Sequence, residues 1–303
     1  MIRPYHFTKD IGKHFISFFE KVVACNGIVC FDFEDSIGSS DQSENTSLKN
    51  SHRISIIRKL KNWSSSIDLN QIGFRINGTE TLNYDLDIEG ISDFKSLNCV
   101  FLPKVECITQ VEKLLHDLPT TIQEIIPIIE TQKGFENLQY ILAINDRRFL
   151  RIAFGHCDFN FSNEYFPFFH QNSIRYWDWI SKLAGLTEFA DKQIINSPVL
   201  DLANGKYFSQ VLKKTKDFKN ITGQITLCLN QTILCAAPEL HAELDLLSEN
   251  ENPVGTCDLA YRTITKFEKY KVMDRYFAMD ENRVLISPQE YKQAKIALEN
   301  CAL

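Results

Sequence analysis

The sequence predicts an α/β protein, a closed TIM (β/α)8 barrel followed by a C-terminal helical extension. Three observations predict this fold class. Short β-prone runs recur along the chain, and segments with a helical spacing of apolar residues separate them. Several runs are also apolar almost throughout, such as residues 125–129 (IIPII). Such runs are typical of parallel strands that are covered on both faces, as in a barrel surrounded by helices.

Eight strands are expected, and seven amphipathic helices separate or follow them. The strands are residues 3–8, 28–33, 71–76, 99–103, 124–129, 149–154, 193–196 and 223–227. The helices are residues 11–23, 51–61, 108–115, 134–144, 173–183, 205–215 and 233–247. A doubly wound sheet is the alternative, but eight strands favour the barrel. The sequence also lacks the G-x-G-x-x-G and G-x-x-x-x-G-K-[S/T] motifs of nucleotide-binding doubly wound sheets.

The chain of 303 residues is expected to hold one catalytic barrel over residues 1–247. Residues 248–303 are polar, charged and rich in tyrosine, and we interpret them as a packing or oligomerisation element. The polar segment 36–50 (SIGSSDQSENTSLKN) directly follows the second strand. It is expected to be an exposed loop, with a mobile lid over the site as the alternative.

Composition excludes several classes of protein. Lys and Arg together number 33 against 39 Asp and Glu, so the net charge is −6 and offers no basic surface for nucleic acid. No apolar run approaches the roughly 18 residues of a membrane-spanning helix. The first ten residues lack the apolar core of a signal peptide. Nine cysteines without a C-x-x-C pair indicate reduced thiols, so we expect a cytoplasmic protein without a disulfide framework.

Polar residues lie at the ends of five of the predicted strands, at the barrel end where active sites lie. The candidates are Asp32, Glu34, Asp35, Arg75, Asn77, Lys104, Glu130 and Asp158. Glu130 and Asp158 end adjacent strands, and two carboxylates completed by water and substrate oxygens suit Mg²⁺, or Mn²⁺ in its place. The guanidinium of Arg75 suits bidentate binding of an anionic substrate. The alternative for each carboxylate is a helix cap or a simple ion pair.

Six short motifs occur in series over the first half of the chain. They are residues 3–7 (RPYHF), 31–36 (FDFEDS), 75–77 (RIN), 103–106 (PKVE), 129–131 (IET) and 155–158 (GHCD). In this order they resemble the motifs Arg-Ser-x-Leu-Phe, Asp-Leu-Glu-Asp-Ala, Arg-Val-Asn, Pro-Lys-x-Glu, Ile-Glu-Thr and Gly-x-x-Asp. These belong to the HpcH/HpaI aldolase and citrate lyase β-subunit (CitE-like) family.

The resemblance implies a Mg²⁺-dependent carbon–carbon lyase that acts through the enolate of a 2-oxo acid or an acyl-CoA thioester. Glu130 and Asp158 would bind the metal, and Arg75 the substrate carboxylate, with Arg3 and Asn77 as further substrate-binding residues. Glu34, Asp35 and Lys104 would support catalysis around them. The family also implies a homo-oligomer, a trimer or hexamer.

The sequence departs from the family pattern in two places. Residues 222–231 (TGQITLCLNQ) lack the His and Pro that the family carries near its eighth strand, and residues 159–171 (FNFSNEYFPFFHQ) replace an Ala- and Gly-rich segment. We therefore expect a divergent member with a substrate other than citryl- or malyl-CoA. Two alternatives remain: an acyl-CoA thioester hydrolase that uses the same metal site, and a non-catalytic ligand-binding or assembly protein.

Overall fold

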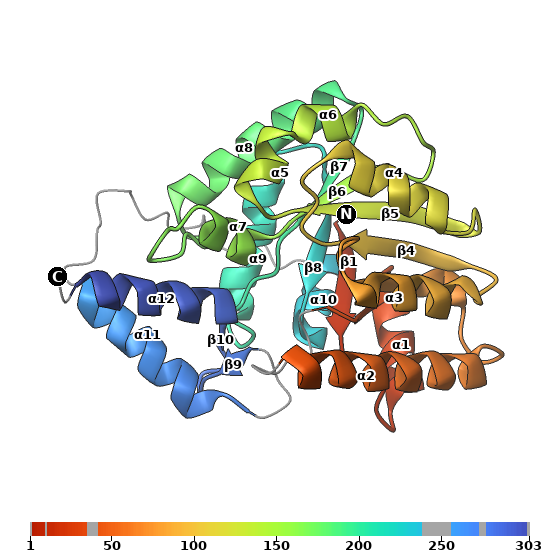
Figure 1. The fold of residues 1–303 in the computed structure, drawn as a ribbon, viewed down its shortest axis with the longest axis horizontal. Coiled ribbons are helices and arrows are strands. Elements are labelled where there is room, and N and C mark those ends of the chain that lie inside the picture. The colour runs from red at the N-terminus through yellow and green to blue at the C-terminus, as the bar shows by residue number, and fades with distance from the viewer. Residues whose placement is uncertain (1, 10, 35–41, 238–255, 273–276, 302–303) are drawn as a thin grey trace.

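The computed structural model describes residues 2–9, 11–34, 42–237, 256–272 and 277–301, and these form a closed parallel barrel surrounded by helices (Figure 1). The barrel strands are β1 (Arg3–Thr8), β2 (Ile28–Asp32), β3 (Ile72–Arg75), β4 (Leu97–Leu102), β5 (Ile122–Ile129), β6 (Arg151–Phe154), β7 (Gln193–Asn196) and β8 (Ile221–Thr226). They neighbour one another in chain order, and β1 pairs with both β2 and β8, which closes the barrel. The predicted fold class is confirmed.

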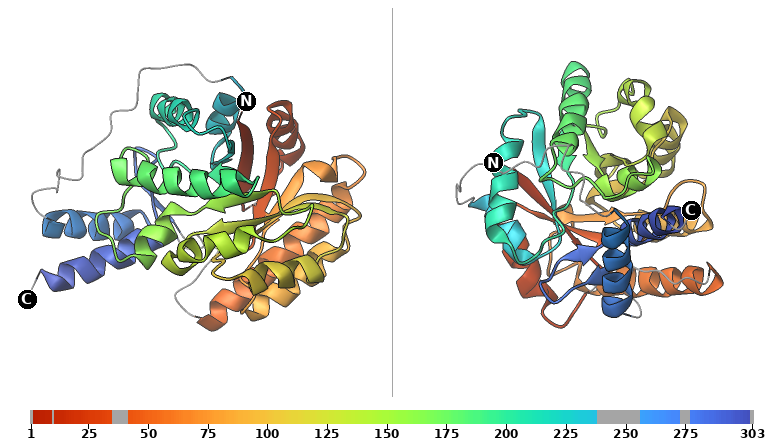
Figure 2. Two further views of the ribbon diagram at one scale, coloured as in Figure 1. Left: turned by 90° about the horizontal axis from the view of Figure 1, so that it is seen from above. Right: turned by 90° about the vertical axis from the view of Figure 1, so that its left-hand side faces the viewer.

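Helices follow the strands and cover the outside of the barrel (Figure 2). They are α1 (Phe15–Ala24), α2 (Gln42–Trp63), α3 (Leu82–Ser92), α4 (Ile108–Asp117), α5 (Gln132–Glu136), α6 (Leu138–Leu142), α7 (His156–Ser162), α8 (Ile174–Phe189), α9 (Gly205–Thr215) and α10 (Leu229–Ala236). Within the described ranges, no helix is both long enough and apolar enough to cross a membrane.

The period-2 pattern of each strand divides the core into two apolar clusters. On β2, Ile28 and Cys30 belong to a small cluster with Tyr5 and Phe101, whereas Val29 belongs to the large cluster that packs against the helices. Because successive side chains of a strand point to opposite faces, the small cluster fills the barrel interior. The barrel is therefore a solid core, and a site can form only at its ends.

Three sequence predictions about helices need correction. The segment 36–50 is not wholly a loop, because α2 already begins at Gln42; residues 35–41 lie outside the described part. The predicted helix 134–144 is two short helices that meet at Asn137. Helix α3 was not expected, since its buried positions Tyr84, Asp87 and Ile91 include a carboxylate that interrupts the apolar stripe.

The C-terminal extension packs against the end of the barrel that the C-terminal ends of the strands form (Figure 1). It contains α11 (Thr256–Tyr270), the short hairpin of β9 (Ala278–Met279) and β10 (Leu285–Ile286), and α12 (Pro288–Asn300). Leu285 N donates to Leu200 O at 2.9 Å and Leu202 N to Arg283 O at 3.1 Å, so backbone hydrogen bonds join the hairpin to the loop after β7. The expected boundary at residue 247 falls among residues 238–255, which the structure does not describe.

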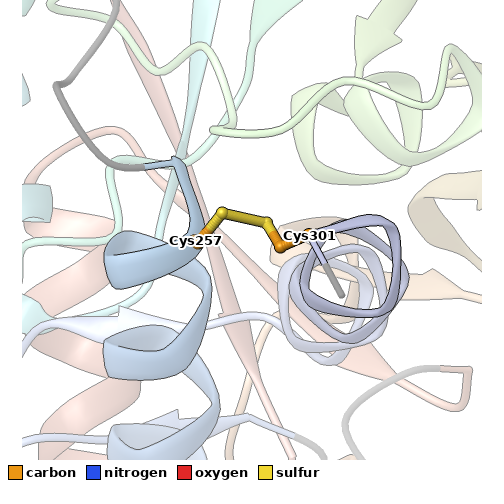
Figure 3. Close-up of a disulfide and its surroundings, with 2 residues drawn as sticks. All are labelled: Cys257 and Cys301. Carbon is orange, nitrogen blue, oxygen red and sulfur yellow. A yellow bond between two sulfur atoms is a disulfide. The ribbon is translucent and has the colours of Figure 1, made fainter. Parts of the chain in front are cut away.

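A disulfide between Cys257 and Cys301 joins the start of α11 to the end of α12 (Figure 3). The expectation that all nine cysteines are reduced thiols is therefore wrong for this pair. The two residues are 44 positions apart in the sequence, so no short spacing motif reveals them. They meet because α11 and α12 run antiparallel and pack together, with Phe267 stacked on Tyr291 at 4.2 Å between ring centroids.

Candidate active site

The C-terminal ends of the strands surround a cavity of about 360 Å³. This lies within the roughly 300–1000 Å³ of small-molecule sites. Four of the predicted polar residues line it, namely Asp32, Arg75, Glu130 and Asp158. They come from the ends of β2, β3 and β5 and from the first turn of α7, so the barrel brings together residues that are far apart in the sequence.

Glu130 is a buried carboxylate directly after β5, with 3% of its surface exposed. Its Oε1 accepts a hydrogen bond from Lys104 N at 2.8 Å. Burial and the negative charge of Asp158 raise the pKa of Glu130 well above its usual range. A Cβ atom on Gly155 would lie 2.2 Å from Glu130 Oε2, so glycine at the end of β6 leaves the room in which this carboxylate sits.

Asp158 contacts the C-terminal extension as well as the barrel. Gln289 Nε2, from α12, lies 3.1 Å from Asp158 Oδ1 and 3.0 Å from Oδ2. The ammonium of Lys104 lies 3.8 Å from Asp158 Oδ1. The side chain of Asp158 is therefore held between the loop after β4 and the first turn of α12.

Lys104, which follows β4, contacts acidic residues that follow β2 and β5. Its Nζ donates to Glu34 Oε1 at 2.6 Å, while its backbone N binds Glu130. Its φ of 51° lies in the left-handed region, which non-glycine residues seldom adopt and which is enriched at functional sites. This conformation lets one residue present both its amide and its ammonium to carboxylates. Glu34 and Lys104 thus contact the residues that line the cavity.

Arg75 is fixed by carboxylates from β2 and the residues that follow it. Its Nε and Nη2 donate to Asp32 Oδ1 and Oδ2 at 2.8 and 2.6 Å, a bidentate pair, and its Nη1 lies 3.0 Å from Glu34 Oε2. The sequence analysis singled out Asp32 as part of an acidic cluster and did not assign it this partner. The guanidinium is therefore held in one orientation at the cavity wall.

The carboxylate groups of Glu130 and Asp158 are suitable ligands for a hard divalent cation. Both supply oxygen, the ligand atom that such a cation prefers. In the part of the chain that the structure describes, no group of three or more His, Cys, Asp or Glu residues could hold a metal ion. Glu130 and Asp158 would supply two oxygen ligands and leave other positions to water and substrate, an arrangement that suits Mg²⁺.

Two predicted substrate-binding residues are not brought to the cavity. Arg3 lies at the opposite end of β1, where its Nε donates to Asn26 O at 3.2 Å. Asn77 is 2% exposed and donates through Nδ2 to Phe33 O at 3.0 Å and to Asp87 Oδ2 at 2.7 Å. These contacts hold the loop after β3 in place. A third predicted residue, Asp35, lies outside the described residues.

Sequence reasoning missed Gln289, and it did not assign His6 to the site. His6 lines the cavity, is 4% exposed, and hydrogen-bonds through Nδ1 to Thr232 Oγ1 at 2.8 Å. Burial lowers its pKa to about 4, so the ring is neutral at physiological pH. Its place on β1, two residues before the strand ends, was the available signal. Gln289 had none, because 131 residues separate it from Asp158.

Solved structures of other proteins share this architecture. RipC from Yersinia pestis superposes with a TM-score of 0.58 at 18% identity, covering 78% of this chain and 96% of that one. CitE, the citrate lyase β subunit, from Mycobacterium tuberculosis complexed with oxaloacetate and magnesium gives 0.58 at 15% identity, covering 77% and 94%. The chain has the fold of the citrate lyase β subunit. The predicted resemblance is thus confirmed for the fold.

The CitE-like fold extends over the C-terminal part of the chain. CitE from the same organism in complex with magnesium, acetoacetate and coenzyme A covers 99% of this chain and 98% of that one, at 14% identity and a TM-score of 0.57. No protein-family model matches the sequence, and no curated protein matches it either.

Proposed function

We propose that this protein is a Mg²⁺-dependent carbon–carbon lyase that cleaves or forms a C–C bond next to the carbonyl group of a 2-oxo acid or acyl thioester. One observation carries the proposal: two acidic residues, Glu130 and Asp158, line one cavity with a fixed guanidinium, that of Arg75. The solved structures with this fold support it, since CitE has been seen with magnesium together with oxaloacetate, or with acetoacetate and coenzyme A.

Glu130 and Asp158 would hold the metal ion. When bound, Mg²⁺ supplies a Lewis acid that polarises the carbonyl oxygen of the substrate, so that a carbanion beside it costs less. The buried position of Glu130 suits this role, because electrostatic interactions are stronger away from water.

Arg75 would bind the carboxylate group of the substrate. Asp32 and Glu34 already determine its orientation, so little side-chain entropy is lost when the substrate binds. Lys104 offsets the negative charge of Glu34 and Asp158, which would otherwise repel an anionic substrate. These residues would bind and orient the substrate.

An activity screen tests the proposal. The protein is incubated with Mg²⁺ and a panel of 2-hydroxy acids and acyl-CoA thioesters, and both the release of a 2-oxo acid and the release of free thiol are measured. We expect a 2-oxo acid as product, and we expect Asp158→Asn to abolish its release. Free thiol without a C–C cleavage product would identify a thioester hydrolase, and neither product would indicate a binding protein; both outcomes contradict the proposal.

A further inference from the structure

The cavity has two chemically different walls. Asp32, Arg75, Glu130 and Asp158 come from β2, β3, β5 and α7, and His6, Thr8 and Lys9 come from β1 and the residue after it, whereas another part of the lining is apolar. The apolar residues are Pro198, Leu200, Leu202, Ile225, Leu227, Phe277, Met279 and Leu285. They come from the loop after β7, from β8 and from the C-terminal extension. In a closed barrel of eight strands β7 lies opposite β3, so the loop after β7 lies across the barrel mouth from Arg75. Asp158 follows β6 and therefore lies beside this loop.

The extension supplies part of the apolar wall through one face of its hairpin. Met279 and Leu285 are directly opposite each other in the register of β9 and β10, and both line the cavity. Their neighbours Ala278 and Ile286 lie on the other face and pack against Phe267 of α11. The period-2 alternation of the strands thus directs one pair of side chains to the cavity and the other to the helices.

The apolar wall extends beyond the part of the cavity that the reacting groups of the proposed substrate would occupy. A three-carbon 2-oxo acid would occupy only the polar side of the cavity, near Arg75 and Glu130. Much of the remaining space is bounded by the apolar wall, although His6, Thr8, Lys9 and His156 also line the cavity. Burying an apolar group against that wall is favourable. A hydrophilic substituent there would lose its water without gaining a polar partner.

We propose that this wall is an apolar subsite, and that the substrate of the proposed reaction is a small organic acid that carries an alkyl or aryl group. The inference rests on the proposed function for the polar half of the substrate. The apolar half follows from the side chains of the apolar wall alone. The carboxylate and carbonyl would lie toward Arg75, Glu130 and Asp158, and the alkyl or aryl group toward Met279 and Leu285.

Calorimetric titration of the full chain in Mg²⁺ tests the subsite without requiring turnover. The ligands are pyruvate, 2-oxobutanoate, 2-oxopentanoate, 2-oxohexanoate and phenylpyruvate. We expect affinity to rise about fourfold with each added methylene group, as complete burial of a methylene predicts. We expect phenylpyruvate to bind more tightly than pyruvate. Equal or falling affinity along the series would overturn the inference.

Two variants test whether the gain in affinity with chain length comes from the apolar wall. Met279→Gln keeps the size of the side chain but makes it polar, and Leu285→Asn changes the residue opposite. We expect each to remove most of the gain with chain length and to alter pyruvate affinity less than twofold. Ile296→Asn is the matched control, since Ile296 is exposed on α12 and lies away from the cavity lining. An undiminished gain in both folded variants would contradict the subsite; if neither folds, the wild-type series decides.

The two proposals fail separately. Rising affinity along the series without C–C cleavage of any panel compound supports the apolar subsite and contradicts the lyase. Release of a 2-oxo acid together with a flat series supports the lyase and overturns the subsite.

Discussion

Gln289 Nε2 lies 3.1 and 3.0 Å from the two carboxylate oxygens of Asp158. The contact joins the first turn of α12 in the extension to a candidate metal ligand at the end of the barrel. Gln289 is itself 6% exposed, so the contact is shielded from water. The extension is thus part of the structure of the site as well as a packing element.

Gln289→Leu should weaken Mg²⁺ binding by about 10–100-fold, because hydrogen bonds to a ligating carboxylate fix its orientation. Isothermal titration with Mg²⁺ measures this change. Gln293→Leu is the control, since Gln293 lies one turn further along α12 and donates instead to Glu164 O. Unchanged or tighter Mg²⁺ binding by Gln289→Leu would show that the amide does not position Asp158.

Glu130→Gln should stabilise the protein in the absence of Mg²⁺, because it removes the cost of ionising a buried carboxyl group that Asp158 repels. The raised pKa of Glu130 means that the unmodified protein loses stability as pH rises from about 4.5 through the pKa of the folded state. Mg²⁺ should raise the melting temperature of the unmodified protein and leave that of Glu130→Gln unchanged. Equal stabilisation of both proteins by Mg²⁺ would contradict the metal assignment.

His6 should make the protein less stable in acid. Burial lowers its pKa to about 4, whereas the unfolded chain binds a proton below about 6.5. Unfolding therefore becomes more favourable as pH falls from 6.5 to 4, by about 3 kcal/mol in total. His6→Asn should remove this part of the loss in urea titrations at pH 7 and pH 4. A variant with the same acid sensitivity as the unmodified protein would contradict the shift.

The disulfide between Cys257 and Cys301 should stabilise the extension. Closing a loop over a separation of 44 residues restricts the unfolded chain by about 4 kcal/mol. We expect reduction to lower the free energy of unfolding by up to that amount, measured by denaturant titration with and without reductant. The double variant Cys257→Ser, Cys301→Ser should not respond to reductant, whereas Cys228→Ser should respond fully. A free energy of unfolding unaffected by reductant would count against the bond.

The barrel could be predicted because its signals are local. All eight strands appear where apolar runs predict them, with ends that differ by at most two residues. Buried parallel strands must be apolar on both faces, and this property is visible in the run itself. Helix α3 was missed for the converse reason, since Asp87 is buried by pairing with Arg53 and the run alone does not show that partner.

Part of the site could also be predicted, because several of its residues directly follow strands. Asp32, Arg75, Glu130 and Asp158 follow strands, and the barrel rule alone brings strand ends to one cavity. Asn77 also follows a strand, but its side chain turns to Asp87 on α3, a helix that the sequence did not indicate. Gln289 and the apolar wall depend on how the extension packs, which no short sequence pattern encodes.

The central claim is that Glu130, Asp158 and Arg75 together bind Mg²⁺ and a 2-oxo acid. Calorimetric titration of pyruvate into the protein, with Mg²⁺ and then with EDTA, tests it most directly. We predict that pyruvate binds tightly only with Mg²⁺ and that it tightens Mg²⁺ binding by the same factor. Arg75→Lys should weaken pyruvate binding, because an ammonium has fewer donors and cannot keep the bidentate pair with Asp32 that orients the guanidinium. Pyruvate binding of equal strength in EDTA, or equal affinity in Arg75→Lys, would contradict the claim.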